Sequence, residues 1–436
     1  MHVKLSKNMR RRFNIAALLL MCSSCLYAQS GTNSPYSQFG LGVLSEQSGG
    51  VNRGMNGLGV GLREHDQVNV LNPASYSSID SLSFIFDAGF SGQITNFKED
   101  GRSKNAKNAN FEYAVAGFRL RKGLGMSLGI LPFTNVGYHY QNTGFVDNGR
   151  TTTYTNQFAG EGGLRHVFVG AGWSPLKGFS IGANIAYLWG SYTRSVTNSY
   201  SDEDISSLTK TYGATISSYK LDFGVQYEQK ITGKDRLALG LTYGLGHRLG
   251  ADATCVLVTS GIVSDTASHK AEDAWELPMT IGAGLSWNHG NRWRVGFDYT
   301  LQKWGSVSSP NYYNEAGKMV YSVEKGLLKD RSKVTLGGEY CNNENGRDFF
   351  QRIRYRLGFS YATPYVKVNG KDGPKELSVS AGFGIPIKNG YNNRSMLNIS
   401  GQWQQTSAPG LLKENTFRIN IGFTFNERWF MKWKFE

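Results

Sequence analysis

Apolar residues alternate with small or polar residues along most of the chain beyond residue 80. In one such run, Leu237, Leu239 and Leu241 alternate with Ala238 and Gly240. A period of two places successive side chains on opposite faces of a strand, so each run predicts a strand with one apolar and one polar face. The runs are roughly 9–14 residues long, which exceeds the usual soluble strand and matches strands that cross a membrane.

The alternation predicts fourteen strands, an even number that is typical of bacterial outer-membrane barrels. The predicted strands span residues 82–94, 111–121, 124–140, 164–173, 179–194, 216–229, 236–249, 276–288, 292–304, 332–341, 349–361, 376–388, 396–405 and 414–425. Their connections alternate between short turns and long loops, as in barrels with periplasmic turns and external loops. We therefore expect an all-β fold, an antiparallel transmembrane barrel of about 14 strands at residues 81–426.

Tryptophan positions agree with this fold. Tryptophans fall at or near predicted strand ends, where an indole ring would lie at a membrane–water boundary. Those beside short turns are Trp173, Trp287 and Trp293, and those beside long loops are Trp189, Trp275, Trp304 and Trp403. Trp304 has the parity of the polar face, so it fits the pattern only if a bulge shifts it. The alternative interpretation is that these tryptophans fill the open ends of the core of a β-sandwich.

The N-terminus has the pattern of a secretory signal peptide. Three arginines at residues 10–12 precede an apolar run at residues 13–21, and Ala28 ends a plausible cleavage site. We assign residues 1–28 to this signal. The chain has a formal net charge of +14, but an exported protein with no nucleic-acid motif gives no reason to expect a nucleic-acid partner. Only Cys255 and Cys341 follow the signal, too few for a disulfide framework.

Two segments flank the predicted barrel. Residues 29–80 are rich in Gly, Ser and Asn and contain no long alternating run. Irregular backbone is tolerated at membrane depth only away from lipid, so we expect this segment to plug the lumen. Residues 427–436 continue past the last strand as an amphipathic extension toward the periplasm. This extension is interpreted as a partner-binding tail, a terminal assembly signal or a segment lying along the membrane.

Together these features resemble the FadL family of outer-membrane transporters for hydrophobic compounds. The resemblance rests on the Gly-rich segment, on Asn72-Pro73-Ala74 before the first strand, and on Pro132-Phe133 in the third strand. Residues 34–42 and 160–164 are similar to the Bacteroidota branch of such proteins. The resemblance implies a monomeric barrel with an N-terminal plug, and a sideways exit at a kink of strand three, here at Pro132 and Phe133. An ordinary edge bulge is the alternative for Pro132.

The predicted lumen is polar and of mixed charge, unlike a conduit for fatty acids. By parity, ten charged residues of the strands face inward, where we expect them to form ion pairs; these are Asp87, Lys220, Asp222, Glu228, Arg294, Asp298, Glu339, Arg354, Arg356 and Arg418. An apolar pocket would have to come from Tyr36, Phe39, Leu41 and Val43 of the plug and from the loops. Packing of these four residues against the wall is the simpler interpretation.

No constellation of residues predicts catalysis. Residues 178–182 have the spelling of a nucleophile elbow, but they lead from a turn into a strand, whereas that motif joins a strand to a helix. The seven histidines have no metal-ligand spacing. We expect no enzyme activity, no cofactor and no bound metal.

Two functions follow for a protein of the cell outer membrane. The first is passive transport of small hydrophobic or amphipathic molecules, with outer-membrane lipid and a small hydrophobic ligand as partners. The second is a barrel subunit of an outer-membrane protein assembly or secretion complex, with a protein partner bound through the C-terminal extension. The sequence specifies neither the substrate nor the oligomeric state.

Overall fold

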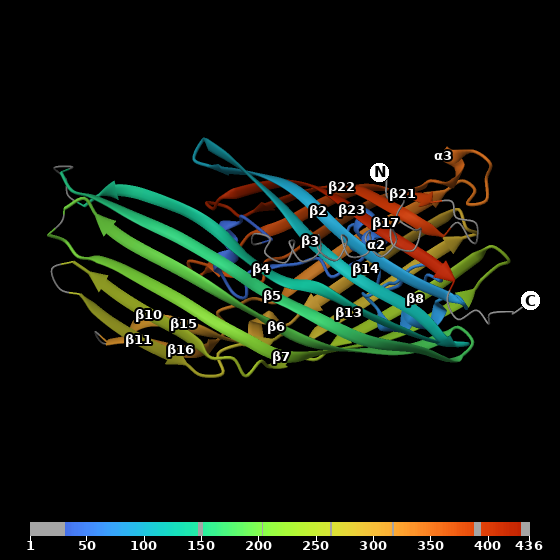
Figure 1. The fold of residues 1–436 in the computed structure, drawn as a ribbon, viewed down its shortest axis with the longest axis horizontal. Coiled ribbons are helices and arrows are strands. Elements are labelled where there is room, and N and C mark those ends of the chain that lie inside the picture. Colours follow the sequence, from blue (N-terminus) through green and yellow to red (C-terminus); the bar gives the residue numbers. More distant parts are fainter. Residues whose placement is uncertain are drawn as a thin grey trace, which may run out of the picture.

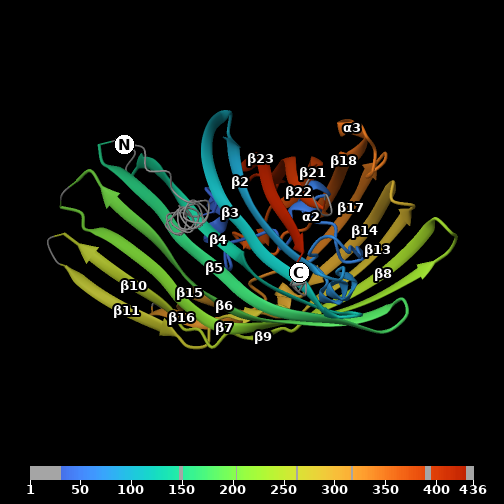
Figure 2. The same ribbon diagram turned by 45° about the vertical axis from the view of Figure 1, so that its right-hand side comes forward.

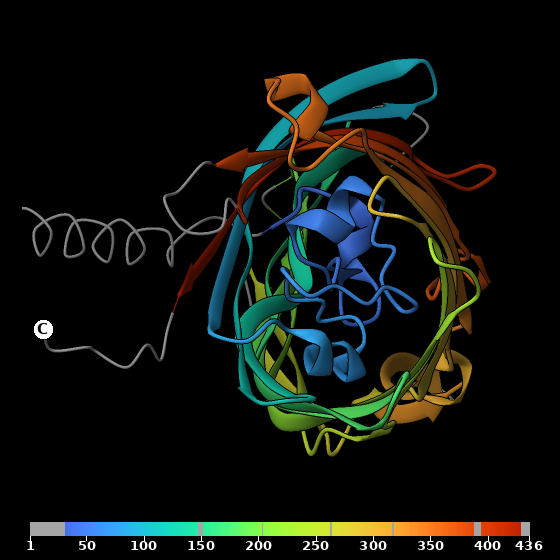
Figure 3. The same ribbon diagram turned by 90° about the vertical axis from the view of Figure 1, so that its right-hand side faces the viewer.

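The computed structural model describes residues 31–146, 151–202, 204–261, 264–315, 318–387 and 394–428, and these form a closed antiparallel β-barrel (Figures 1 and 3). The fourteen predicted strands are confirmed, and the first and last of them pair to close the barrel. They are β2 (Ser83–Glu99), β3 (Arg102–Arg121), β4 (Leu124–Phe145), β5 (Thr153–Leu176), β6 (Phe179–Tyr200), β7 (Ser207–Lys230), β8 (Asp235–Gly244), β13 (Thr280–His289), β14 (Trp293–Gln302), β17 (Arg331–Cys341), β18 (Arg354–Ala362), β21 (Lys375–Ile387), β22 (Ser395–Ser407) and β23 (Lys413–Arg428).

The apolar face of each strand points outward and the polar face points into the lumen. Leu239 and Leu241 on β8 are 51% and 58% exposed, whereas Ser286 and Thr335 on neighbouring strands are buried inside. Exposed apolar side chains in a band around a barrel are the surface that lipid covers. The period-two pattern therefore distinguishes the residues that face the lumen from those that face outward, as the sequence predicts.

Several strands continue past the membrane band as a curved sheet, which we call the wing (Figure 2). The wing comprises the outer ends of β4–β7 together with β10 (Ala253–Ser260) and β11 (Asp265–Ala271), and β10 pairs with β7. The prediction of long loops at residues 141–163, 195–215 and 250–275 is therefore wrong. These segments carry Thr, Ser, Tyr and Asn on both faces, so they form strands without the apolar alternation that identified the others. The predicted long loop at residues 95–110 is wrong as well, because β2 and β3 pair along it and leave a turn only at Asp100 and Gly101.

Further short elements occupy the remaining long connections. The predicted loop at residues 305–331 contains η4 (Trp304–Ser306) and the hairpin of β15 (Ser308–Glu315) and β16 (Lys318–Lys325). Two small ladders join β9 (His247–Arg248) to β12 (Glu276–Leu277), and β19 (Lys367–Val368) to β20 (Lys371–Asp372). The turn between β17 and β18 carries the short helix α3 (Phe349–Arg352), so the strand predicted at residues 349–361 begins at Arg354 instead.

Two of the predicted girdle tryptophans are buried instead. Trp304 is fully buried in η4, after the end of β14, which explains its parity without a bulge in that strand. Trp275 is 2% exposed and donates a hydrogen bond from Nε1 to the Tyr192 hydroxyl at 3.0 Å. Both belong to one apolar cluster at the outer end of the barrel, whereas Trp173, Trp287, Trp293 and Trp403 are exposed on the wall.

Residues 31–80 lie inside the ring of strands and form the lumen plug (Figure 3). The plug contains η2 (Pro35–Gln38), the two-residue strand β1 (Val43–Leu44), α2 (Gly50–Gly54) and η3 (Pro73–Ser78). Wall glycines let the plug backbone approach closely: a Cβ on Gly240 would lie 2.0 Å from the Val60 carbonyl oxygen. The fit of plug and wall therefore depends on small residues at the contact.

The predicted signal peptide and residues 429–436 of the C-terminal extension lie outside the described residues. No helix in the ranges described above is long and apolar enough to cross a membrane.

The facing of the strands leads to a first prediction. Leu241→Arg places a charge against lipid and should destabilise the barrel by roughly 2–4 kcal/mol near the midplane. Gln157→Arg is the matched control, because Gln157 is exposed on the part of β5 that lies in the wing. The stability of both variants is measured by unfolding the reconstituted barrel, where folded and unfolded protein are distinguished by the migration of unboiled and boiled samples on a gel. Equal losses from the two variants would contradict the assigned facing.

Candidate functional site

The lumen is crossed by a network of buried ion pairs that joins the plug to three neighbouring strands. Glu339 on β17 accepts hydrogen bonds from Arg294 on β14 at 3.0 Å and from Arg356 on β18 at 2.6 Å. From the plug, Glu64 pairs with Arg294 at 2.7 Å and Asp66 pairs with Arg354 at 3.1 Å. A buried charge without a partner is costly, so each of these groups holds its partner in place.

The plug carboxylates differ in their protonation equilibria. Burial raises the pKa of Glu64 above its ordinary value, although Arg294 lies beside it. Burial also opposes ionisation of Asp66, but the guanidinium of Arg354 outweighs it and holds the pKa of Asp66 below its ordinary value. The network is thus held together by arginines that are shared between plug and wall acids.

A second ion pair anchors the middle of the plug. Arg53 on α2 pairs with Glu112 on β3 at 2.9 Å, with the two side chains 3% and 7% exposed. Arg53 also donates to the carbonyl oxygens of Ser48 and Glu46, each at 3.0 Å. One arginine therefore fixes both the local fold of the plug and its contact with the wall.

The structure brings some of the predicted lumen residues together and leaves others apart. Arg294, Glu339, Arg354 and Arg356 form one network. Elsewhere, Asp87 accepts from the Tyr113 hydroxyl at 3.0 Å, and Asp298 accepts from the backbone N–H groups of Gly59 and Val60 at 2.6 and 2.8 Å. Asp222 pairs with Lys220 and Arg418 bonds to Gln93, while Glu228 lies on β7 away from the main network.

The Asn72-Pro73-Ala74 segment fastens the inner end of the plug. Asn72 Oδ1 accepts from the Ala74 N–H at 3.1 Å and so caps η3. Its Nδ2 donates to the Val60 carbonyl at 2.9 Å and to the Val225 carbonyl on β7 at 3.2 Å. This one amide therefore joins two parts of the plug to the wall.

The barrel wall is split between β3 and β4 at its outer end. In the described part of the chain these strands pair only from Ala114 with Ile130 to Arg121 with Leu124. Immediately above this ladder each strand has a bulge, at Glu112 on β3 and at Phe133 on β4. A bulge bends its strand and ends regular pairing, so the two bulges explain why β3 and β4 separate there. We call this gap the seam.

The Pro132-Phe133 segment lies at the lower end of the seam. Phe133 is 8% exposed and points inward, with its ring edge-on to His166 at 6.4 Å between centroids. Residues of the plug cover this part of the strand: Ser45 N–H donates to the Phe133 carbonyl at 3.0 Å and Gln47 Nε2 to the Pro132 carbonyl at 2.7 Å. The plug therefore substitutes for the missing strand partner.

The first residues of the plug fill more of the seam from inside. β1 pairs antiparallel with β4, Val43 with Asn135 and Leu44 with Thr134. On the opposite edge, Asn110 of β3 donates to the Gly31 carbonyl at 2.8 Å. The plug thus bonds to both sides of the split wall.

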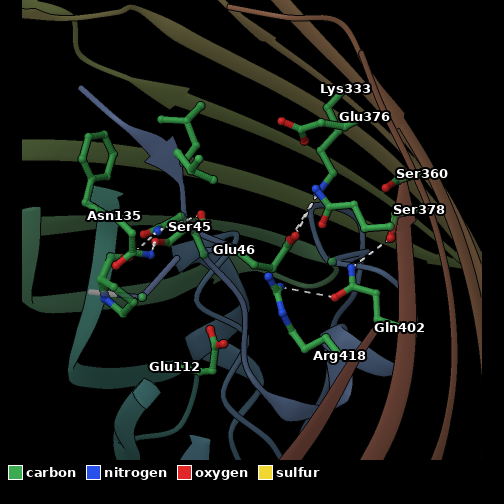
Figure 4. A pocket seen from close by; sticks show the side chains of 18 of the residues that line it. Ser45, Glu46, Glu112, Asn135, Lys333, Ser360, Glu376, Ser378, Gln402 and Arg418 are labelled. Carbon is green, nitrogen blue, oxygen red and sulfur yellow. Dashed lines mark hydrogen bonds and ion pairs between the residues drawn. The ribbon is translucent and has the colours of Figure 1, made fainter. Parts of the chain in front are cut away.

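A cavity of about 250 Å³ lies between the seam and the far wall of the lumen (Figure 4). Charged and polar groups converge on it: Lys333 and Glu46 pair at 3.1 Å, and Arg418 points in and donates to Gln402 at 3.4 Å. Asn135 Nδ2 bonds to the Ser45 hydroxyl at 2.7 Å at its seam side. An apolar molecule would remove water from these charged and polar groups, so the cavity suits a polar solute or water.

Two of the four apolar plug residues named above, Tyr36 and Val43, line a second cavity of about 70 Å³, and the other two pack against the wall. Leu41 is 1% exposed and packs in the outer apolar cluster with Phe133 and Tyr365, and Phe39 packs against the same cluster. Tyr36 is 8% exposed. These contacts agree with packing of the plug against the wall.

Sequence reasoning missed several charged residues of this site. Glu46 and Arg53 are isolated charges in a segment rich in Gly, Ser and Asn, whereas Glu64 and Asp66 belong to a charged run at residues 63–66. Both features are a signal that would have pointed to paired positions. Glu112 has the parity of the lipid-facing residues of β3, and only the bulge turns it inward. No sequence pattern reveals that bulge.

The Arg53 anchor leads to a second prediction. Arg53→Met should destabilise the plug by about 3–5 kcal/mol, because Glu112 is left as a buried charge without this partner. Arg248→Met is the control, since Arg248 is 66% exposed in its pairs with Asp273 and Glu276, and exposed pairs contribute about 0–1 kcal/mol. Protease cleavage within residues 31–80 of the folded barrel measures plug release. If the plug of Arg53→Met resists protease as well as the plug of the parent protein does, Arg53 does not anchor the plug.

A third prediction concerns pH. Burial alone would raise the pKa of Glu46, but Lys333 and Arg53 outweigh it and hold that pKa below its ordinary value. A depressed folded pKa contributes stability above the unfolded pKa of about 4.3, and this stability is lost as pH falls through the folded value. Protease sensitivity of the plug should therefore rise as pH falls below about 4. Lys333→Met should weaken this dependence; an unchanged pH profile would exclude Glu46 as its source.

Solved structures with the same fold include two toluene transporters and a FadL homologue. The toluene transporter TodX of P. putida is 14% identical, with a TM-score of 0.59 over 89% of this chain and 100% of its own. The toluene transporter TbuX of Ralstonia pickettii is 15% identical, with a TM-score of 0.58 over 87% and 98%. A FadL homologue of Pseudomonas aeruginosa is 11% identical, with a TM-score of 0.58 over 87% and 99%. At these identities the likeness shows the fold, and it confirms the predicted plugged barrel of FadL type.

No curated protein has a sequence that matches this chain. One family model, named BamG, matches residues 9–436, which covers nearly the whole sequence. The chain therefore belongs to the BamG family.

Proposed function

We propose that this protein is a barrel subunit of an outer-membrane complex that assembles other outer-membrane proteins. The observation that carries the proposal is the plug, which is cross-linked to the wall by buried ion pairs of Arg53, Arg294 and Arg354. A conduit for apolar molecules needs an apolar path and a plug that moves, whereas this lumen offers paired charges. The assembly role that the BamG family name carries supports the same function.

The outer surface of the molecule fits a subunit role as well. The wing extends the wall beyond the membrane band with strands that have polar residues on both faces (Figure 2). Such a sheet contributes nothing to membrane insertion, and a rigid surface of this kind suits contact with another protein.

Transport of small hydrophobic or amphipathic molecules is the second candidate, and the seam favours it. The cavity touches the seam at Pro132 and Phe133, so a displaced plug would connect the lumen with the outer end of the wall. The named toluene transporters share the fold. The charged lining of the cavity is the argument against an apolar substrate.

Purification and conductance separate the two functions, which is the fourth prediction. The protein extracted from the outer membrane in mild detergent should co-purify with partner proteins in fixed stoichiometry, and the isolated barrel should not conduct in a planar bilayer. Deleting residues 34–70 should open the lumen and produce conductance, because the plug fills it.

Recovery of a lone barrel would contradict the assembly role. Transport would then be tested by uptake of toluene through an intact outer membrane, comparing cells with and without the protein. Uptake that depends on the protein would establish the second function.

A further inference from the structure

The seam leaves one edge of the barrel wall available for pairing above the plug. In the described residues, the stretch of β4 from His139 to Thr143 has β5 as its strand partner and no strand on its other side. Below it, Ser37 of η2 bonds to the backbone of Gly137, and the Gln38 side chain accepts from the Tyr140 hydroxyl at 3.2 Å. Figures 1 and 2 show the β2–β3 hairpin standing clear of the β4–β5 hairpin. The outer part of β4 is thus an edge strand of the wing.

The backbone groups that face this gap can be assigned from the contacts below it. The Phe133 carbonyl accepts from Ser45, and the N–H of Gly137 donates to the Ser37 hydroxyl at 3.1 Å. Backbone groups of alternate residues point to the same side of a strand. The N–H and carbonyl groups of His139, Gln141 and Thr143 therefore face the gap.

This edge has none of the usual protection against strand addition. Proteins block open edges with lysines, prolines, bulges or inward charges. Residues 139–143 are His, Tyr, Gln, Asn and Thr, a polar and uncharged run with exposed side chains at His139 and Gln141. The other free edge of the wing, β11, carries Asp265 and Lys270.

The opposite side of the gap is the outer part of β3, which is positively charged and therefore indicates the charge of a segment that would bind there. The outer part of β3 carries Arg102, Lys104 and Lys107, all exposed, and its acids Glu99 and Asp100 lie at the turn with β2. An extended segment that lies along β4 would face these cations. Opposite charges on neighbouring strands stabilise pairing, so an acidic segment fits the gap best.

We propose that residues 139–143 of β4 pair with an acidic, extended segment of a partner protein at the outer surface of the membrane. The chain itself shows the mode of binding, because β1 already adds to the same edge one step lower, at Thr134 and Asn135. Backbone hydrogen bonds to an exposed sheet edge are an established mode of peptide recognition. This inference rests on the proposed function, and it names the chemistry of the partner.

Substitution of Gln141 tests the pairing in the intact complex. Gln141→Pro removes the amide that faces the gap while the bonds of β4 to β5 are made by the neighbouring residues. The amount of partner that co-purifies should fall by about tenfold. This is the factor expected when one interstrand hydrogen bond is lost and the group on the partner is left unpaired. Gln141→Thr keeps the amide and should retain the partner. Gln141→Asp should reduce the partner through repulsion, and Gln141→Lys should not.

Photo-crosslinking supplies a readout that does not depend on folding of the proline variant. A photo-reactive residue at 139, 141 or 143 should crosslink to one acidic segment, at positions that step by two residues along the partner. The same residue at 157 is the control, because Gln157 lies opposite Gln141 at the same level but has strands on both sides.

The outcomes separate the two proposals. Crosslinks from 157 as strong as those from 141, or full retention of the partner by Gln141→Pro and Gln141→Asp, would overturn the edge pairing and leave the subunit role standing. A parent protein that purifies without any partner in fixed stoichiometry would overturn both.

Discussion

Charge inside the barrel is the constraint on which the rest of the structure depends. Arg294, Arg354 and Arg356 project into the lumen from neighbouring strands, and one wall acid, Glu339, is shared among them. Glu64 and Asp66 of the plug supply the additional carboxylates. The plug is therefore part of the electrostatic balance of the wall, and a barrel emptied of it would leave several arginines short of partners in a narrow lumen.

The same plug also compensates for a defect in the wall. Bulges at Glu112 and Phe133 end the β3–β4 ladder, and each bulge turns its side chain inward, one to an ion pair and one to the apolar cluster. The backbone groups freed at Phe133 are bonded by Ser45 of the plug. Unpaired backbone groups are costly near lipid, so the plug stabilises the split wall.

Much of the fold could be predicted because alternation of apolar and polar residues follows directly from facing lipid and lumen. The strands of the membrane band obey this pattern, and their polar faces identified Arg294, Glu339, Arg354 and Arg356 as lumen residues. The wing escaped prediction because its strands are rich in Thr, Ser and Asn, and because the residues that they add to the outer apolar cluster are largely Tyr and Ala, such as Tyr138, Tyr192 and Ala253, so the alternation is weak. Glu112 escaped because a bulge reverses parity without a sequence signal, and Trp304 because a short helix, not a strand, positions it.

Fold likeness and lumen chemistry point to different functions, and the lumen chemistry carries more weight. A FadL-type barrel supplies a wall, a plug and a seam, and these parts serve a conduit only if the plug can leave its place. Here the plug is held from three sides: Asn72 at the inner end, Arg53 in the middle and β1 at the seam. Each contact uses groups that burial leaves without water, so releasing the plug means breaking buried ion pairs and backbone hydrogen bonds together. A wall that is fixed inside and has open strand edges at its outer end is better suited to binding another protein than to passing a solute.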